Sequence, residues 1–168
     1  MSTTAPAGDR ARICVTVAVA PEVAFEVFTR ELDEWWLSGP QYRFVGRTPG
    51  VLIFEPRIGG RLFESFETES GSQVFERGRV TAWDPPARLA FSWRAGNFTA
   101  HESTQVEVSF EPTPHGTCVT VVHSGWAALR EGHPARHGLT GAAVSRMIGL
   151  WWGELLTGLR EHLDARAS

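Results

Sequence analysis

The sequence contains 168 residues, of which 42% are hydrophobic and 21% are charged, with a formal net charge of −3. A chain of this length can bury one full hydrophobic core, and the composition is ordinary for a globular protein in water. Because no block of like charge occurs, the chain is a poor candidate for binding nucleic acid or an anionic membrane, and we expect neither as a partner.

All sixteen basic residues are arginine, which excludes Schiff-base and general-base mechanisms that require lysine. The N-terminus has no apolar run of the signal-peptide type, and no window is long enough to span a bilayer. We therefore expect a cytoplasmic protein without a membrane span. Cys14 and Cys118 both fall in expected strands, and in that compartment we expect them to be packed, unpaired thiols.

The first elements follow a short tail. Residues 1–10 are small and polar and are predicted to be disordered, and residues 11–165 are predicted to form a single domain. Apolar side chains alternate over residues 13–19, which predicts a strand. Pro21 suits the first turn of a helix over residues 21–30, and a second short helix is expected at 31–36.

Beyond a loop at residues 38–50, runs rich in β-branched and aromatic residues alternate with turn residues. This succession of adjacent strands predicts an antiparallel meander. Strands are expected at residues 51–55, 61–69, 74–83, 88–94, 104–112 and 117–124.

The segment GRVTAWDPPARLAFSW, residues 78–93, is typical of two strands joined by an Asp-Pro-Pro turn. Leu89, Phe91 and Trp93 recur at every second position, so they share one face of the second strand. That face carries more aromatic bulk than a thin sheet needs, which predicts the wall of an aromatic-lined concavity.

The last expected element is a long helix over residues 140–162. Its opposite side carries polar or small residues, so the helix is amphipathic and is the available partner for one face of the sheet. The apolar stripe consists of Val144, Ile148, Trp151, Leu155 and Leu159, widened by Met147 and Trp152.

Four motifs occur in register along the chain: AFEVFTRELDEWW (24–36), EPRIGGRLFE (55–64), the segment 78–93, and GTCVTVVHSGW (116–126). Together they resemble the START/Bet v 1-like (SRPBCC) superfamily, and within it the branch of homologues of the activator of Hsp90 ATPase. The resemblance covers roughly residues 12–163. It implies an α+β helix-grip fold: a curved antiparallel sheet of about seven strands wrapped around a long C-terminal helix, with two short helices between strands one and two.

The resemblance also implies several functions, because relatives in the superfamily bind lipids, hormones or polyketides and some act as aromatases or cyclases. We expect a small-molecule binding protein, monomeric or homodimeric, whose apolar or aromatic ligand lies between the sheet and the last helix. The alternatives are a cyclase, aromatase or hydrolase that uses the same cavity, and a co-chaperone-like interaction module that contacts a chaperone. The expected cavity residues are Trp36, Arg57, Glu64, Phe66, Phe91, Trp93, His123, Trp151, Trp152 and Leu155.

Glu64 is the first candidate for a polar role in the cavity. It shares a strand face with Leu62 and Phe66, so it points inward if they do. A carboxylate among aromatic rings is costly unless it is paired, and the pair would either hold adjacent strands or orient a ligand. Its candidate partners are Arg57, Arg77 and Arg79.

His123 shares its strand face with Val119 and Val121. A single histidine on an apolar face is more often a hydrogen-bonded core residue than a catalyst. Glu64 and His123 are therefore weak candidates for an acid or base, and no catalytic residue is assigned.

No cofactor or metal is expected. His133 and His137 are four residues apart, but Pro134 between them disfavours a helix and no third ligand is near in sequence. Gly59-Gly60 lacks the pattern of a phosphate-binding loop and is better explained as a sharp turn into a strand.

Overall fold

A computed structural model describes residues 9–39, 41–43, 50–94, 97–99, 101–130 and 132–166 of the chain. The tail expected at residues 1–10 lies outside this range except for its last two residues, and the second of these, Arg10, begins the first strand. Among the described residues, no helix is long and apolar enough to cross a membrane.

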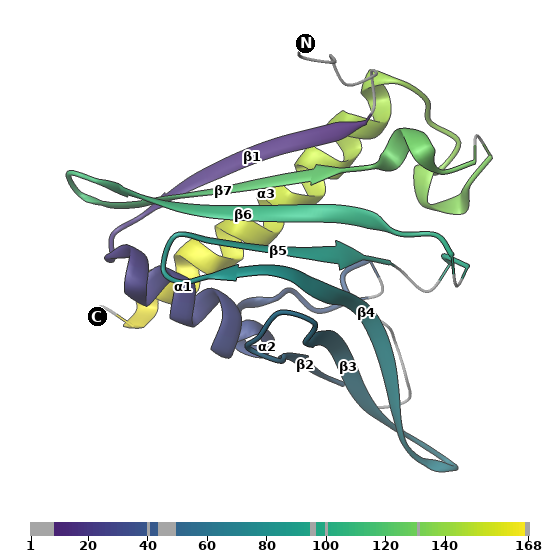
Figure 1. Cartoon of the computed structure of the whole chain (residues 1–168), viewed down its shortest axis with the longest axis horizontal. Coiled ribbons are helices and arrows are strands. Elements are labelled where there is room, and N and C mark those ends of the chain that lie inside the picture. Colours follow the sequence, from purple (N-terminus) through teal and green to yellow (C-terminus); the bar gives the residue numbers. More distant parts are fainter. Residues whose placement is uncertain are drawn as a thin grey trace.

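Within the described residues the sheet has seven strands, and every neighbouring pair is antiparallel, in the order β1-β7-β6-β5-β4-β3-β2. The long helix α3 runs across one face of this sheet, and the short helices α1 and α2 connect β1 to β2 (Figure 1). The helix-grip fold is thereby confirmed. The strands are β1 (Arg10–Val17), β2 (Val51–Phe54), β3 (Arg61–Thr68), β4 (Gly71–Asp84), β5 (Arg88–Trp93), β6 (Thr104–Thr113) and β7 (Gly116–Ser124). The helices are α1 (Pro21–Arg30), α2 (Leu32–Trp35), η1 (Trp126–Ala128), η2 (Pro134–Arg136) and α3 (Ala142–Arg166), of which η1 and η2 are short 3-10 turns.

Two strands, β1 and β4, differ from the expected ones by more than one residue at a boundary. β4 begins at Gly71, because Thr68 already pairs with Gly71 across a tight turn in which Gly71 has a φ of 109°. β1 ends at Val17, because its partner Thr117 lies next to the first residue of β7; beyond Val17 the Thr117 hydroxyl, and not a strand pair, holds the chain by donating to the Val19 carbonyl at 2.7 Å. Each boundary is set by pairing with the neighbouring strand, which the local sequence pattern does not show.

The buried face of α3 is centred on Trp152, whereas the expected apolar stripe was centred on Trp151. Trp152 is only 1% exposed and lies at the centre of this face, whereas Trp151 is half-buried at its side. The reason is a sheet contact, since the Trp152 indole Nε1 donates to His123 on β7 at 2.9 Å. The buried residues of α3 are Val144, Ile148, Gly149, Trp152, Leu155, Leu156, Leu159 and Leu163.

On β5, Leu89, Phe91 and Trp93 all face the core, as the alternation predicts, and none is more than 4% exposed. Phe91 packs edge-to-face on Phe54 of β2 at 5.1 Å between ring centroids.

Both cysteines are free thiols, but the expectation that both are packed is wrong for Cys14, which shares the exposed face of β1 with Arg12 and Thr16; Cys118 is half-buried.

Candidate functional site

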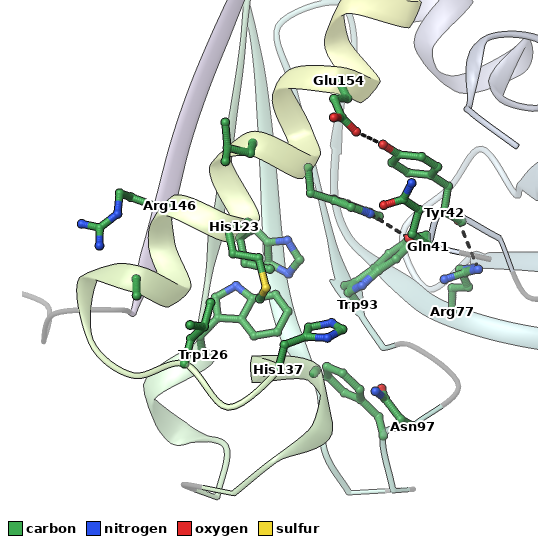
Figure 2. Close-up of a pocket in the computed structure, with 18 of the residues that line it drawn as sticks. Gln41, Tyr42, Arg77, Trp93, Asn97, His123, Trp126, His137, Arg146 and Glu154 are labelled. Atoms are coloured by element: carbon green, nitrogen blue, oxygen red, sulfur yellow. Dashed lines mark hydrogen bonds between the residues drawn. The ribbon is translucent and has the colours of Figure 1, made fainter. Parts of the chain in front are cut away.

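A cavity of approximately 950 Å³ lies at the end of the sheet that faces the N-terminal half of α3 (Figure 2). Its walls come from α3, from the strands β4, β5 and β7, from the segment between β7 and α3, and from residues 41–43 and 97–98. The lining includes Arg77, Trp93, His123, Trp126, Trp151 and Glu154.

Indole rings dominate one wall. Trp93 of β5 and Trp151 of α3 have centroids 5.7 Å apart, and Trp36 packs against both at 5.8 Å. Trp126 and Phe98 form another aromatic pair, at 6.3 Å. Such rings offer a large, rigid apolar surface that suits a flat or apolar ligand.

Residues 41–43 are attached to α3 by two side chains of the helix. Trp151 Nε1 donates to the Gln41 carbonyl at 2.8 Å, and the Tyr42 hydroxyl donates to the Glu154 carboxylate. The Tyr42 carbonyl in turn accepts from Trp36 Nε1 at 2.9 Å. Backbone and side chain of Tyr42 are therefore both fixed, although the residue belongs to no helix or strand.

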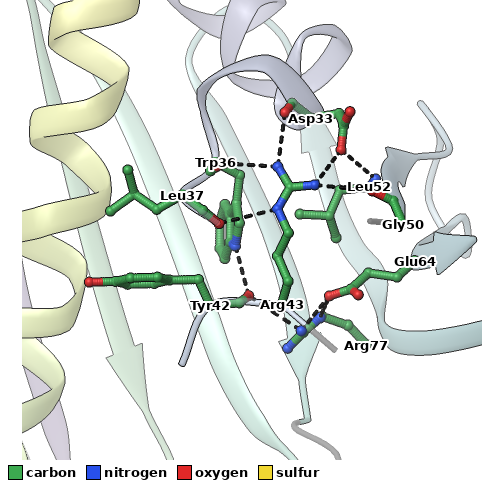
Figure 3. A network of polar contacts seen from close by, with 9 residues as sticks. All are labelled: Asp33, Trp36, Leu37, Tyr42, Arg43, Gly50, Leu52, Glu64 and Arg77. Atoms are coloured by element: carbon green, nitrogen blue, oxygen red, sulfur yellow. Dashed lines mark hydrogen bonds and ion pairs between the residues drawn. The ribbon is translucent and has the colours of Figure 1, made fainter. Parts of the chain in front are cut away.

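Arg43 fixes the same segment from the other side (Figure 3). Its Nη1 donates to Asp33 Oδ1 of α2 at 2.6 Å, and its Nη2 donates to the carbonyls of Asp33 and Trp36. The same Asp33 oxygen accepts the backbone N–H of Leu52 in β2 at 2.9 Å. One ion pair thus joins α2, β2 and the segment that borders the cavity.

A second ion pair, between Glu64 and Arg77, is buried at the base of this region (Figure 3). Glu64 is 1% exposed, and its Oε1 accepts from Arg77 Nε at 2.7 Å and from Arg77 Nη2. Arg77 Nη2 also donates to the Tyr42 carbonyl, and the guanidinium lies 4.9 Å from the Trp93 ring. Burial lowers the pKa of Arg77, whereas the Glu64 carboxylate acts in the opposite direction.

The inward orientation of Arg77 follows from an irregularity in strand pairing. Leu62 pairs with Gly78 and Phe63 pairs with Glu76, so Arg77 is an additional residue on β4. Such a bulge redirects a side chain, and here it places Arg77 on the same side as Glu64.

His123, in the cavity wall, takes part in a directed chain of hydrogen bonds. An indole N–H can only donate, so the 2.9 Å contact makes His123 Nδ1 the acceptor from Trp152. His123 Nε2 then carries the proton and donates to Thr104 Oγ1 at 2.6 Å, and that hydroxyl donates to the Trp93 carbonyl at 3.2 Å. Burial lowers the pKa of His123 to about 3, so the ring is neutral and orients its neighbours.

His133 and His137, which are four residues apart in the sequence, do not point at a common site. His133 is buried, its Nδ1 accepts from the Ala135 N–H at 3.0 Å, and its Nε2 lies 3.1 Å from Glu102. His137 is exposed at the rim of the cavity.

One group of potential metal ligands lies elsewhere, at the junction of α2 and α3. Glu31, Glu34 and His162 have ligand atoms within 4.8 Å of one another. Arg166 pairs with Glu31, so its positive charge already compensates that carboxylate.

Of the ten residues expected to line a cavity, Trp93, His123 and Trp151 do so. Arg57 is an exposed residue whose guanidinium lies 3.6 Å from Glu55, and Phe66 is half-buried on β3. The others lie in the core outside the lining: Trp36, Glu64, Phe91, Trp152 and Leu155.

Tyr42, Trp126 and Glu154 line the cavity, although nothing in the sequence pattern predicts it. Tyr42 and Trp126 lie in connecting segments, where no periodicity orients a side chain, and Glu154 is an ordinary polar residue of a helix. Tyr42 and Trp126 share one signal, an aromatic residue in an otherwise polar segment, and Glu154 has none.

The fold and the cavity place the protein in the class of helix-grip proteins, in which a curved sheet holds a long helix and leaves space at one end. The sequence matches the family model described as "Activator of Hsp90 ATPase homolog 1-like protein" over residues 18–163. The chain belongs to this family.

Solved structures with the same fold include protein MLL2253 from Mesorhizobium loti, with a TM-score of 0.63 and 18% identity over 95% of this chain and 98% of that one. Another is PFC0360w, an HSP90 activator from Plasmodium falciparum, with a TM-score of 0.62 and 18% identity over 93% of this chain and 96% of that one. A third is DynU16 from the dynemicin biosynthetic locus, with a TM-score of 0.60 and 20% identity over 93% of this chain but only 47% of that one. No curated protein sequence matches the chain.

Proposed function

We propose that the protein binds a small apolar or aromatic molecule in the cavity beside α3. The observation that carries this proposal is a space of approximately 950 Å³ bordered by Trp93, Trp126 and Trp151. Ligand sites are typically concave and mostly apolar, with a few polar groups that fix orientation, and this volume lies within their usual range. The similarity to a protein of a biosynthetic locus agrees with a small-molecule ligand.

Binding without turnover explains the buried polar groups better than cyclase, aromatase or hydrolase chemistry does. Both ring nitrogens of His123 are engaged by Trp152 and Thr104, and its pKa of about 3 keeps it from exchanging protons near neutral pH. Glu64 is held by Arg77, behind the cavity lining. His123 and Glu64 therefore hold neighbouring side chains in place and are not free to act as an acid or a base.

The test uses diphenylhexatriene, a hydrocarbon dye that fluoresces when it leaves water. We expect saturable binding to the wild-type protein. Ala143→Phe adds a ring at a lining position and should raise the dissociation constant roughly tenfold.

Ala142→Phe is the matched control, because Ala142 is exposed and outside the lining. It should leave the affinity unchanged. Equal affinities for Ala143→Phe and wild type, or no saturable binding to the wild type, would contradict the proposal.

A second candidate function is a protein-interaction surface, favoured by an apolar row on the outer face of β2, β3 and β4. Val51 pairs with Ser65, and Ser65 pairs with Val74, so these residues form one row across the strands. Val51 is 47% exposed and Val74 is 51% exposed, and Ile53 next to them is 38% exposed. Adjacent exposed apolar residues often mark protein contacts, and both the family description and PFC0360w suggest Hsp90 as the partner.

Stimulation of the ATPase of a purified Hsp90 tests this candidate. If the row is the contact, the wild-type protein accelerates ATP hydrolysis and Val74→Asp abolishes the effect. Val23→Asp, at an exposed apolar position on α1, should retain it. A wild-type protein without any effect on the ATPase would rule the candidate out.

A further inference from the structure

A groove of approximately 830 Å³ lies between β1 and α3, at the opposite edge of the sheet from β2. Residues 10–13 form its β1 side, and mostly small residues between 145 and 157 form its α3 side. Among the described strands β1 pairs with β7 alone, and it is the outermost strand in Figure 1. The free edge of such a strand carries backbone N–H and C=O groups that can pair with another strand.

Every second residue of β1 turns its backbone groups away from β7. The Asp9 carbonyl accepts a backbone N–H just beyond β7 at 3.4 Å, and the Val17 carbonyl lies 2.0 Å from the place that a Cβ on Gly116 would take. Both of these carbonyls therefore point towards β7. The backbone N–H and C=O groups of Arg10 and Arg12, which alternate with them, point outwards along the groove.

Gly153 leaves room in the groove that no packing inside the described chain requires. Glycine in the middle of a helix lowers its stability relative to alanine. At Gly149 an added Cβ would lie 3.4 Å from the Ile13 side chain, so close packing on β1 explains that glycine. At Gly153 no other part of the described chain lies within 4 Å of such a Cβ. The open space at this position indicates an occupant from outside the chain.

An exposed leucine stands beside this space. Leu150 also lines the groove and is 73% exposed, more than any other large apolar side chain that the structure describes. Exposed apolar side chains next to a hollow are typical of a surface that another molecule covers.

Positive charge surrounds the groove, although the chain as a whole carries a net charge of −3. Arg10, Arg12 and Arg146 line it, are exposed, and form no ion pair within the described part of the chain. Figure 2 shows the Arg146 side chain directed away from the labelled residues of the cavity. The one acid of the groove lining, Glu154, already accepts from the Tyr42 hydroxyl. The charge of the groove therefore favours an acidic partner.

We propose that this groove binds an extended acidic segment of another protein, which joins the sheet as an additional strand beside β1. Such an addition satisfies the outward backbone groups, and the side chains supply the specificity. Because side chains alternate between the faces of a strand, those beside Arg10 and Arg12 should be acidic and those over α3, in contact with Leu150, should be apolar. The site does not depend on the ligand proposed for the cavity.

Two other strands fit the groove less well. A second copy of β1 brings Arg10 and Arg12 but no acid, so its pairing with β1 offers no compensating charge. Residues 1–8 also contain no acid, and Pro6 among them has no backbone N–H to donate.

The probe is a fluorescein-labelled peptide, SEVEVEVS, blocked at both ends, whose binding is measured by fluorescence anisotropy. We expect saturable binding to the wild-type protein. A peptide of the same composition without alternation, SEEEVVVS, should bind about tenfold more weakly, because it cannot place acids on one face and apolar side chains on the other. No saturable binding of the alternating peptide, or equal affinities for the two, would overturn the proposal.

Reversal of charge tests the arginines. Arg10→Glu/Arg12→Glu should weaken binding of SEVEVEVS roughly tenfold, and a peptide with lysine in place of glutamate, SKVKVKVS, should bind this variant better than it binds the wild type. Arg57→Glu/Arg160→Glu is the matched control, since it changes the net charge equally at exposed positions outside the groove. Equal losses in the two variants would mean that only net charge matters and would refute the site.

Gly153→Leu tests the space in the groove. The added side chain meets no described atom of the protein and leucine favours a helix, so the variant should fold and bind SEVEVEVS about tenfold more weakly. Ala142→Leu, outside the groove on the same helix, should bind as the wild type does. Ala143→Phe, which obstructs the cavity, should also keep the peptide affinity, whereas Gly153→Leu should keep the affinity for diphenylhexatriene. The two proposals can therefore fail separately.

Hydrogen exchange gives a readout that belongs to strand addition alone. The outward backbone N–H groups of Arg12 and Cys14 should exchange quickly in the free protein and slowly with SEVEVEVS bound. A bound peptide that leaves their exchange unchanged would overturn the proposal, because side-chain docking does not protect them. Protection in the free protein would also overturn it: loss of this protection on deletion of residues 1–8 would assign the edge to that segment, and its loss on dilution of a dimer would assign it to a second copy.

Discussion

The two halves of α3 face the same sheet but contact it differently. In the C-terminal half, Leu155, Leu159 and Leu163 are 2% exposed or less and fill the space between helix and sheet. In the N-terminal half, Met147 and Trp151 are half-buried and border a cavity of approximately 950 Å³. The same helix therefore completes the core at one end and one wall of a cavity at the other.

The interactions that hold the two ends differ accordingly. We call the region around the C-terminal half of α3 the closed end and the region around its N-terminal half the open end. The closed end is held by apolar contacts, which are non-directional. The open end contains the buried Glu64–Arg77 pair, the His123 chain and the Tyr42–Glu154 hydrogen bond. A cavity wall has no protein atoms packed on its cavity side. Hydrogen bonds and ion pairs can hold such a wall in place because they fix the direction as well as the distance of a side chain.

The largest effect is expected at the open end, from Glu64→Gln. The amide cannot balance the charge of Arg77, which is 4% exposed, so we expect a loss of about 3–5 kcal/mol in the free energy of unfolding. Urea unfolding measures it. Glu107→Gln, in the exposed pair with Arg88, should cost much less, and equal losses would show that burial is not the cause.

At the closed end, Leu159→Ala should be the most informative change. Leu159 is 0% exposed, so its truncation leaves a cavity and should cost about 2–5 kcal/mol. Binding of diphenylhexatriene at the far end should not change. Arg160→Ala, at the exposed neighbouring position, controls for effects on the helix itself, and a weakened affinity in Leu159→Ala would contradict the separation of the two ends.

The closed end could be predicted from the sequence better than the open end. Alternation placed Leu89 and Phe91 on the core face of β5, and helical spacing placed Leu155 and Leu159 towards the sheet. These positions follow the two-residue period of a strand or the 3.6-residue period of a helix, and that period predicts which side chains are buried.

The open end depends on features that have no period. Arg77 points inward because of a bulge in the pairing of β3 with β4, which appears only when the strands are aligned. Tyr42 and Trp126 come from connecting segments whose direction is fixed by contacts with distant residues, such as the bond from Tyr42 to Glu154. Glu64 was expected to face inward, and its partner among three arginines could be chosen only from the structure.

A smaller effect is expected from pH. The pKa of His123 is about 3 in the folded protein against an ordinary value of 6.5, so between these values the unfolded chain binds a proton that the folded protein does not. Stability is therefore complete above pH 6.5 and falls as the pH drops, by about 2 kcal/mol between pH 6.5 and pH 5.

Urea unfolding of His123→Gln at both pH values isolates this contribution, because glutamine keeps a donor and an acceptor but does not titrate. The fall in stability should be smaller in this variant by about the same amount. His101→Gln, at an exposed position, should behave as the wild type does. A pH dependence identical to that of the wild type in His123→Gln would refute a neutral, buried His123.

The smallest effect is expected from Met147→Ala, which bears directly on the contrast between the two halves of α3. Met147 borders an existing space, so its truncation enlarges that space and leaves no new enclosed void. We expect a loss below about 1 kcal/mol, well under the cost of Leu159→Ala, because the cavity term that dominates truncations in a packed core is missing. A loss as large as that of Leu159→Ala in urea unfolding would mean that the N-terminal half of α3 is packed like the C-terminal half, and that the space beside it is closed in solution.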